Sequence, residues 1–268
     1  MGRLDGKVAF ITGAARGQGR SHAVRLASEG AAIIGIDVCA QLVAGYPGAT
    51  QEQLAETVEL VKAEGQTMVA VRADVRHLDQ VVAAVAEGLA EFGRLDIVVA
   101  NAGIFTFGLL WEITEEQWHD MIDVNLTGVF HTIKATVPTL IEQGEGGSIV
   151  IVSSVAGLRG VPFAGHYAAA KHGAVGLCRT LANELGQHRI RVNSIHPAAV
   201  RTPMNNDPGL FELILRHADT LAPIFMNALP YMSMEPSEVS HMVAFLASDD
   251  SKYMTGAQIP IDMGALTR

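Results

Sequence analysis

The chain contains 268 residues, of which 49% are hydrophobic and 18% are charged, and its mean hydropathy is +0.25. This composition excludes a disordered chain and allows a large buried core. The net charge of −9 argues against a nucleic-acid partner and against electrostatic docking to an anionic membrane, because both surfaces attract basic proteins.

Cysteine usage and the N-terminal residues predict where the protein works. Cys39 and Cys178 are too few for a disulfide framework, which favours a reducing compartment. No apolar run reaches the ~18 residues of a membrane span. The first residues, MGRLDGKVAFITG, lack the layout of a signal peptide. We therefore expect a soluble, cytoplasmic protein.

Short apolar runs alternate with helix-length segments along the chain. The runs are mostly β-branched and several lack polar alternation, which is typical of strands covered by helices on both faces. This order predicts a parallel, doubly wound sheet in a single α/β domain over residues 1–268. Strands are expected at 8–12, 32–37, 67–73, 97–101, 148–153, 191–196 and 258–262, and helices at 18–29, 51–64, 78–92, 114–142, 166–186 and 236–248.

Two segments interrupt this alternation, and each follows a predicted strand. The first, 39–50, reads CAQLVAGYPGAT, and the second, 203–235, is rich in Met, Leu and Pro. Long structureless connections in a compact domain are usually functional, and ligands of open α/β sheets lie beyond the carboxyl ends of the strands. We expect both segments at that edge. The prolines and large apolar residues of 223–232 favour a hydrophobic substrate lid at 203–235 over additional core.

A glycine-rich loop follows the first strand and opens the first helix. Glycine permits a tight turn and lets the backbone approach a pyrophosphate, whose charge is favoured at a helix N-terminus. The loop lacks the Gly-Lys-Ser/Thr of a Walker A motif, and its position favours dinucleotide binding over an ordinary strand–helix turn. The candidate cofactor-binding residues here are Gly13, Arg16, Gly17, Gln18 and Gly19.

Asp37 and Arg16 indicate different nucleotides. Asp37 ends the second predicted strand, where a carboxylate bonds a ribose 2′-hydroxyl and repels a 2′-phosphate. Arg16 could instead hold a 2′-phosphate. Because an unpaired carboxylate beside a phosphate is costly, the sequence favours NAD over NADP.

Two further strand ends offer contacts to a nucleotide. Asp74 and Val75 follow the third predicted strand, where a short carboxylate could reach an adenine amine. Asn101 and Gly103 follow the fourth, in the triplet Asn-Ala-Gly, whose small residues allow the backbone to approach a ribose. For each pair the alternative is a plain turn between strand and loop.

Tyr167 and Lys171 are four residues apart, so in a helix their side chains share one face. A phenol with a pKa of about 10 is a poor base at neutral pH, and a nearby ammonium lowers that pKa. Tyr167 could then exchange the proton of an alcohol while hydride moves at carbon. Ser154 follows the fifth predicted strand and could bond the substrate oxygen, whereas Asn125 lies within a predicted helix and needs a partner such as a relay water. The alternative is a surface Tyr–Lys pair, which the preceding Ser-Ser loop disfavours.

In ordered combination these motifs resemble the short-chain dehydrogenase/reductase family over nearly the whole chain. The resemblance implies a Rossmann fold with a seven-stranded parallel sheet, a nicotinamide cofactor and a homotetramer. The matching elements are TGAARGQG, Asp37, Asp74, Asn-Ala-Gly, Asn125, Ser154 and YAAAK from Tyr167 to Lys171.

The resemblance also implies a role for each catalytic residue. Ser154 orients the substrate oxygen, and Tyr167 is the acid/base. Lys171 lowers the pKa of Tyr167 and holds the nicotinamide ribose, while Asn125 fixes a relay water. Tyr167 and Lys171 therefore also count among the residues that bind the cofactor.

Three further features follow from the same resemblance. Val200 and Thr202 match positions that contact the nicotinamide carboxamide, and Pro197-Ala198 replaces the usual Pro-Gly of the family without removing a catalytic atom. Within the family, the stretches GAARGQGRSHAVRLA and IDVC and the long segment 39–50 resemble a carveol-dehydrogenase-like, mycofactocin-associated branch. Members of that branch are expected to exchange NAD poorly and to pass electrons to a peptide-derived redox carrier.

The sequence thus predicts an NAD-dependent alcohol dehydrogenase or ketone reductase that acts on a lipophilic secondary alcohol, terpenoid or alicyclic. An NADPH-dependent reductase of 3-oxoacyl or other ketones is the alternative, although it would prefer a basic residue at Asp37. A non-catalytic nucleotide-binding sensor is disfavoured by the presence of Tyr167 and Lys171. The ten histidines show no metal-ligand spacing and Ser153–Ser154 lacks a nucleophile elbow, so neither a metal site nor a hydrolase is expected.

Overall fold

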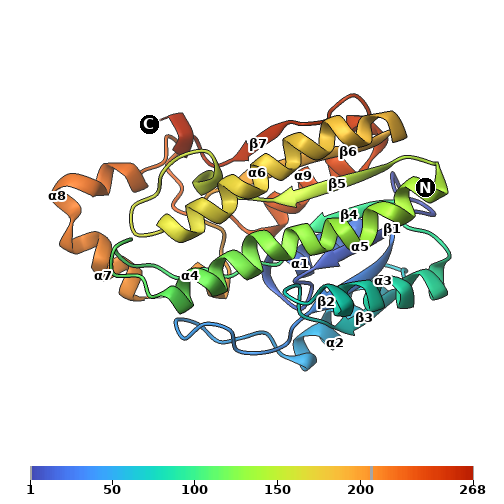
Figure 1. The fold of residues 1–268 in the computed structure, drawn as a ribbon, viewed down its shortest axis with the longest axis horizontal. Helices are drawn as coiled ribbons and strands as arrows, with labels where there is room; N and C mark the ends of the chain where they lie inside the picture. The colour runs from blue at the N-terminus through green and yellow to red at the C-terminus, as the bar shows by residue number, and fades with distance from the viewer. Residues whose placement is uncertain (1, 206–207, 268) are drawn as a thin grey trace.

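The computed structural model describes residues 2–205 and 208–267. Seven parallel strands form one sheet in the order β3-β2-β1-β4-β5-β6-β7 (Figure 1). This is the architecture predicted from the alternation of strands and helices. The strands are β1 (Val8–Thr12), β2 (Ala32–Asp37), β3 (Met68–Arg72), β4 (Ile97–Ala100), β5 (Gly147–Val152), β6 (Ile190–Pro197) and β7 (Gln258–Ile261).

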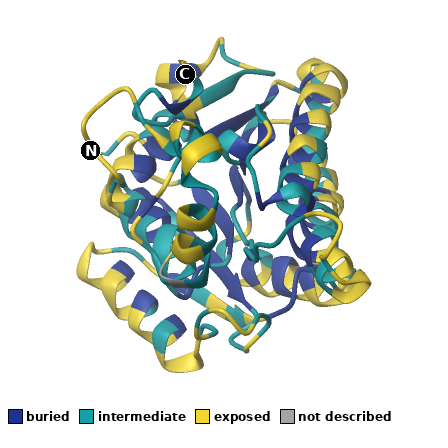
Figure 2. Ribbon diagram, turned by 90° about the vertical axis from the view of Figure 1, so that its left-hand side faces the viewer, coloured by how far each residue is buried: buried dark blue, intermediate teal, exposed yellow. Residues whose placement is uncertain are grey.

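The helices cover both faces of the sheet. α1, α2 and α9 lie on one face, where α1 contacts both of the others, and α3, α5 and α6 lie on the opposite face. Figure 2 shows that the helices turn their buried sides inward and their exposed sides to solvent. Their bounds are α1 (Gly17–Ser28), α2 (Gln51–Ala63), α3 (Leu78–Phe92), α5 (Gly128–Gln143), α6 (Gly165–Leu185) and α9 (Pro236–Ala247).

Each central strand buries both of its faces, which accounts for apolar runs without alternation. In β1, Val8 and Phe10 belong to the core beneath α3, α5 and α6, whereas Ala9 and Ile11 belong to the core beneath α1, α2 and α9. Successive side chains of a strand point to opposite faces, so one apolar run supplies two cores. The sheet is thereby held from both sides, and its carboxyl edge is the place where loops can bind a ligand.

Two segments differ from the sequence prediction. The helix expected at 114–142 begins with a capping box at Thr114, but a π-helical stretch, Asp123–Thr127, separates α4 (Glu115–Ile122) from α5. The segment 203–235 is not structureless. It contains α7 (Pro208–Arg216) and α8 (Ala218–Leu221), because its apolar residues repeat at helical spacing between the prolines. Residues 206 and 207 of this segment lie outside the described residues.

The carboxyl ends of the strands open on one side of the molecule. α7 and α8 project beyond them, on the side where α4 and the segment 39–50 also lie (Figure 1). Within the described ranges, no helix is both long and apolar enough to cross a bilayer.

Candidate active site

The glycine-rich loop between β1 and α1 leaves room for a ligand at the N-terminus of α1. Gly13 and Gly17 adopt positive φ angles of 71° and 56°, which residues with a side chain rarely adopt. A Cβ on Gly19 would lie 1.9 Å from the Gly13 carbonyl oxygen, so the turn requires glycine there too. The side-chain oxygen of Gln18 is buried and has no hydrogen-bond partner among the described residues. A glycine cradle at a helix N-terminus, beside an unpaired polar atom, fits a dinucleotide pyrophosphate.

Two carboxylates stand at the ends of β2 and β3. Asp37 is buried, and its oxygens accept hydrogen bonds from the backbone N–H groups of Ala15 (3.0 Å) and Cys39 (3.0 Å). Asp74 accepts hydrogen bonds from the Arg76 guanidinium at 2.7 to 3.1 Å. Burial alone would raise the pKa of Asp74, but the Arg76 hydrogen bonds outweigh it and lower that pKa. Hydrogen bonds therefore fix both carboxylates at the edge of the sheet.

Arg16 points into the segment 39–50. Its guanidinium donates to the carbonyl oxygen of Pro47 and, at 3.2 Å, to that of Gly48. The segment thus occupies two of the guanidinium nitrogens that the sequence analysis offered to a 2′-phosphate.

The segment 39–50 contains no helix or strand, yet side-chain hydrogen bonds hold it together. The Gln41 amide accepts from the Gly48 N–H at 2.6 Å and donates to the carbonyl oxygen of Tyr46 at 2.8 Å. The Tyr46 hydroxyl accepts from the backbone N–H of Phe105 at 3.1 Å. The segment is therefore closed on itself and attached to the loop that follows β4.

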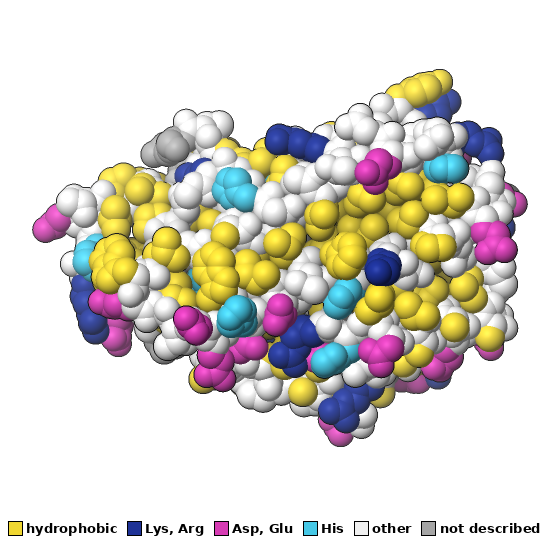
Figure 3. Space-filling view, in the orientation of Figure 1, with side chains coloured by type: hydrophobic (Ala, Val, Ile, Leu, Met, Phe, Trp, Pro, Cys, Tyr) yellow, Lys and Arg dark blue, Asp and Glu magenta, His cyan; other side chains and the backbone are white. Residues whose placement is uncertain are grey.

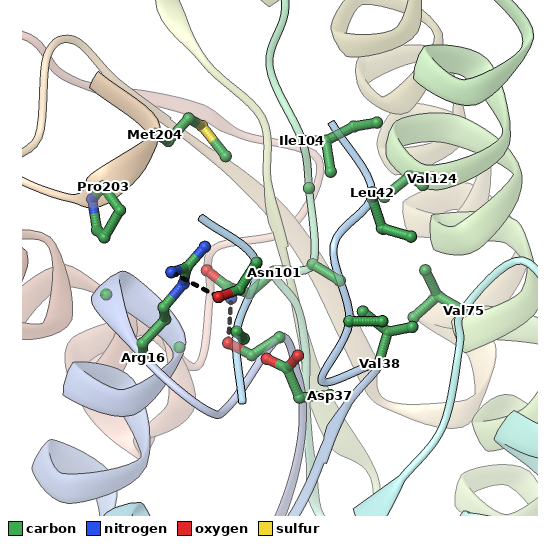
Figure 4. Close-up of a pocket in the computed structure, with 18 of the residues that line it drawn as sticks. Arg16, Asp37, Val38, Leu42, Val75, Asn101, Ile104, Val124, Pro203 and Met204 are labelled. Carbon is green, nitrogen blue, oxygen red and sulfur yellow. Dashed lines mark hydrogen bonds between the residues drawn. The ribbon is translucent and has the colours of Figure 1, made fainter. Parts of the chain in front are cut away.

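These elements enclose a cavity of about 160 Å³. Figure 4 shows Arg16, Pro203 and Met204 along one side of it and apolar side chains such as Leu42 and Val75 along the other. Among the residues predicted to bind the cofactor, those that line the cavity are Gly13, Arg16, Gly17, Gln18, Gly19, Asp37, Asp74, Val75, Asn101, Gly103 and Thr202.

The Asn-Ala-Gly turn after β4 joins the cavity to the predicted catalytic residues. Asn101 donates from Nδ2 to the Thr12 carbonyl oxygen at 2.8 Å and from its backbone N–H to the Thr12 hydroxyl at 3.0 Å. A Cβ on Gly103 would lie 2.7 Å from Asn125 Oδ1 and 3.6 Å from Lys171 Nζ. Glycine at this position lets the cavity wall approach both side chains.

Asn125 is fully buried in the π-helical stretch, and its amide has protein partners. Nδ2 donates to the carbonyl oxygens of Ile104 (3.0 Å) and Met121 (3.1 Å), and Oδ1 accepts from the Ile104 N–H (3.2 Å). The side chain therefore fixes Ile104 at the cavity wall. The relay water assigned to Asn125 stays a prediction.

Ser154 follows β5 and is held from the neighbouring strand. Its carbonyl oxygen lies 2.7 Å from His196 Nδ1, and His196 Nε2 lies 2.9 Å from the Ser194 hydroxyl. Burial lowers the pKa of His196, so the neutral ring donates to Ser154 and accepts from Ser194. A buried histidine of β6 thus sets the position of the Ser154 backbone.

Tyr167 and Lys171 lie one turn apart in α6. Burial raises the pKa of Tyr167 to about 12, and the nearby Ser154 side chain opposes this only in part. Lys171 Nζ lies 5.6 Å from the centre of the Tyr167 ring and donates to the Val152 carbonyl oxygen at 2.9 Å. Burial lowers the pKa of Lys171 to about 8. Burial thus dominates the pKa of Tyr167 in this geometry, and the expected lowering of that pKa by Lys171 stays a prediction.

Val200 and Thr202 follow β6 and have different surroundings. A Cβ on Gly17 would lie 3.2 Å from the Thr202 methyl carbon, so Thr202 contacts the glycine-rich loop. Val200 is buried in the core beneath α1 and α9 and pairs with Met234 through a backbone bridge. Thr202 thus lines the cavity, whereas Val200 anchors the start of the following segment.

Comparison with known proteins accounts for this arrangement. Residues 13–265 match the sequence profile of a family described as enoyl-(acyl carrier protein) reductase. A short-chain dehydrogenase of Mycobacterium paratuberculosis bound to NAD superposes with a TM-score of 0.96 and 44% identity, covering 100% of both chains. The chain belongs to the short-chain dehydrogenase/reductase family. It is therefore an oxidoreductase.

Two further relatives are carveol dehydrogenases. The (−)-trans-carveol dehydrogenase of Rhodococcus erythropolis is 47% identical over 98% of this chain and 99% of its own length. Carveol dehydrogenase from Mycobacterium avium, crystallised in complex with NAD, is 49% identical with a TM-score of 0.94 over 100% of both chains. The sequence resemblance to the short-chain dehydrogenase/reductase family, including its carveol-dehydrogenase-like members, is thereby confirmed.

Some residues that shape the site of this short-chain dehydrogenase/reductase were not identified from sequence. Tyr46 and Gln41 act on backbone groups, and His196 contacts the Ser154 carbonyl oxygen across two strands. Because their partners are backbone groups, which every residue has, no pair of matching residue types in the sequence indicates these contacts. The position of 39–50 after β2 was the one available signal, and it located the segment without identifying Tyr46.

Proposed function

We propose that this enzyme transfers hydride between NAD and a lipophilic secondary alcohol, with Tyr167 as the acid/base. The observation that carries the proposal is the meeting of three groups beside the dinucleotide cavity. The Ser154 side chain lies near enough to Tyr167 to lower its pKa, and buried Lys171 approaches Gly103 at the cavity wall. A proton donor, an oxygen-binding hydroxyl and a cation at one point are what alcohol–ketone interconversion requires.

NAD is the cofactor, and when bound it supplies the carbon that accepts or returns the hydride. Asp37 suits the ribose 2′-hydroxyl, since its carboxylate would repel a 2′-phosphate. Arg16 is engaged by carbonyl oxygens of Pro47 and Gly48. The Asp74 oxygens keep lone pairs for an adenine amine beyond those that bind Arg76.

The protein groups divide the remaining work. Ser154 holds the substrate oxygen, and Tyr167 takes the alcohol proton or returns it to the ketone. Because burial keeps the Tyr167 hydroxyl protonated in this geometry, it is prepared for the proton-donating direction. Lys171 adds positive charge beside the nicotinamide ribose, and Asn125 acts by fixing Ile104 at the wall.

A lipophilic substrate is supported by the relatives that act on carveol and by the segment 203–235. In its described residues, Ile224 accepts a hydrogen bond from Arg159, and the Phe225 ring stacks on Phe163 at 6.4 Å between ring centres. The segment therefore brings apolar side chains to the loop that precedes Tyr167. We propose that it is the substrate lid.

Slow cofactor exchange and an external electron acceptor belong to the same proposal. The segment 39–50 lines the cavity and is bound to Arg16 on one side and to Phe105 on the other. A covered nucleotide leaves slowly, so reoxidation in place by a mycofactocin-like redox carrier would speed turnover. Release of NADH after desalting measures this directly.

We also propose a cytoplasmic homotetramer. Apolar side chains gather over the face that carries α5 and α6 (Figure 3), where Phe130 is 45% exposed. Trp118 on α4 is 39% exposed as well. Contiguous apolar surface on a water-soluble chain favours association, and sedimentation of the purified protein measures the assembly.

Two alternative functions would give different results in cofactor binding and turnover. A 3-oxoacyl reductase using NADPH would need a partner for the 2′-phosphate, yet Asp37 stands at that position and Arg16 is engaged elsewhere. A non-catalytic sensor would bind the nucleotide without turnover. Cofactor titration and a panel of cyclic alcohols distinguish both from the dehydrogenase.

The test of the proposed function is Tyr167→Phe, which removes the proton-carrying oxygen and keeps the ring. Turnover should fall by about 10²–10⁴-fold, whereas NADH binding, followed by its fluorescence, should change little. A folded Tyr167→Phe protein with near-normal turnover would show that another group moves the proton. Tyr253→Phe, at a tyrosine that is 90% exposed, is the matched control.

A further inference from the structure

We propose that Tyr46 is a positioning residue for Tyr167, so that the reaction centre is complete only when the segment 39–50 is closed. This inference rests on the proposed function, because Tyr167 has its catalytic role only there. Tyr46 belongs to a segment that follows the adenosine end of the sheet, yet its side chain reaches the catalytic end. One phenol thus connects the two ends of the cavity.

The contact between Tyr46 and Tyr167 runs through Phe105. The Tyr46 hydroxyl accepts the Phe105 N–H at 3.1 Å. The Phe105 ring in turn packs edge-on against the Tyr167 ring, with 5.1 Å between ring centres and 89° between planes. An edge-to-face pair fixes the mutual orientation of its rings. Holding the Phe105 backbone therefore restrains the ring against which Tyr167 lies.

Phe105 also lines a second pocket, and on that side it has few packing partners. A cavity of about 300 Å³ lies beside the wall formed by 104–107, between that wall, residues 42–45 and α4. Packing on this side cannot fix the wall, since a void supplies no contacts. The hydrogen bond from Phe105 to Tyr46 crosses from the wall to the segment that forms the opposite border of this void.

Tyr46 is itself held in place. The Gln41 amide binds its carbonyl oxygen at 2.8 Å, and Arg16 binds the carbonyl oxygen of Pro47, the next residue. A residue before proline has a restricted backbone. The hydroxyl is half-buried, and burial raises the pKa of Tyr46, so it stays protonated at neutral pH.

The test compares Tyr46→Phe with the surface control Tyr253→Phe. Tyr46→Phe keeps the ring and removes the oxygen that accepts the Phe105 N–H. Hydrogen exchange of the Phe105 amide should become about fivefold faster, as expected for the loss of one hydrogen bond. Tyr253→Phe should leave that exchange unchanged, and thermal unfolding confirms that both variants are folded.

The second measurement distinguishes a role of Tyr46 in positioning Tyr167 from a role only in holding the segment 39–50 closed. Hydride transfer in a single turnover, with NAD bound and (−)-trans-carveol or cyclohexanol as the alcohol, should slow about fivefold in Tyr46→Phe, with little change in KM. Faster exchange at Phe105 with an unchanged hydride-transfer rate would overturn the proposal and leave Tyr46 as a fastening for the segment. Unchanged exchange would overturn it as well. The exchange readout needs no activity, so loss of the proposed function, seen as normal turnover by Tyr167→Phe, is distinguished from failure at Tyr46.

Discussion

The segments 39–50 and 203–235 both extend beyond the carboxyl ends of the strands, but they are fixed in opposite ways. The first has no helix or strand, yet Gln41, Arg16 and Tyr46 hold it through hydrogen bonds. The second contains α7 and α8 but leaves Phe211 60% exposed and Met232 86% exposed. Regular secondary structure therefore does not decide which segment is held. Side-chain hydrogen bonds attach the first segment through Arg16 and Tyr46 and the second through Arg159, but the second keeps its apolar side chains exposed.

Among the changes that bear on this comparison, Asp37→Ala should have the largest effect, and it concerns cofactor choice. The carboxylate fixes the Ala15 and Cys39 N–H groups and is the group proposed to bind the ribose, so its loss should weaken NAD(H) binding about a hundredfold. NADP(H) binding should change less, so the preference for NAD(H) over NADP(H) should become smaller. Titrations of both nucleotides into Asp37→Ala, Asp37→Asn and the exposed control Asp79→Ala measure the effect. Tighter NADP(H) binding by the wild type would mean that Arg16 sets the preference.

The next effect concerns the packing of α1 against α9, the helix that follows the segment 203–235. His22 is fully buried there, with Nδ1 2.8 Å from the Ser240 hydroxyl, and burial lowers the pKa of His22 from 6.5 to about 3. The unfolded chain binds the extra proton between these two values, so stability is complete above pH 6.5 and falls as the pH drops through this window.

At pH 5 the free energy of unfolding should be lower than at pH 7 by about 2 kcal/mol from His22 alone. Urea unfolding of the wild type and His22→Gln at both pH values measures this contribution. The exposed His119→Gln is the control. An equal pH dependence in the wild type and His22→Gln would assign the acid sensitivity to other groups, such as His166 and His196, whose pKa values burial also lowers.

Gln41→Ala should loosen the first segment alone. It removes hydrogen bonds to Gly48, Tyr46 and Val43, so bound NADH should dissociate about tenfold faster. KM for the alcohol should stay near its wild-type value. Stopped-flow release of NADH measures the change, and the exposed Gln51→Ala is the control. Unchanged release would show that 39–50 does not limit dissociation.

Arg159→Lys should have the smallest effect, and on the second segment. Arg159 donates to the carbonyl oxygens of Ile224 and Ala265, and lysine cannot reproduce this forked geometry. KM for the alcohol should rise only about threefold, because the lysine ammonium keeps the charge and can replace one of the two hydrogen bonds. NADH release should not change. The reverse result, faster release with constant KM, would contradict the separate roles of the two segments.

The sequence was sufficient to predict the parts of this protein whose structure depends on short-range residue patterns. Unalternating apolar strands required two covered faces, and the glycines of TGAARGQG required a tight turn, so the sheet and its loop were predicted. The pKa of Tyr167 was not, because spacing to Lys171 says nothing of burial. Tyr46 was missed because its partner is a backbone N–H fifty-nine residues away. Short-range sequence patterns predict local structure, but they do not predict hydrogen bonds to backbone groups that are distant in the sequence.

The π-helical stretch at Asp123–Thr127 makes chain length matter more than residue identity in this part of the molecule. Its wider turn, with the Gly128 N–H bonded to the Asp123 carbonyl oxygen, accommodates one residue more than a regular helix would. Deleting a single residue there would allow the regular pitch to return and would rotate α4 by about 100° about the helix axis relative to α5. Trp118 and the wall contact at Asn125 would then face new directions at once. A substitution in this stretch changes one contact, whereas a deletion changes the phase of an entire helix.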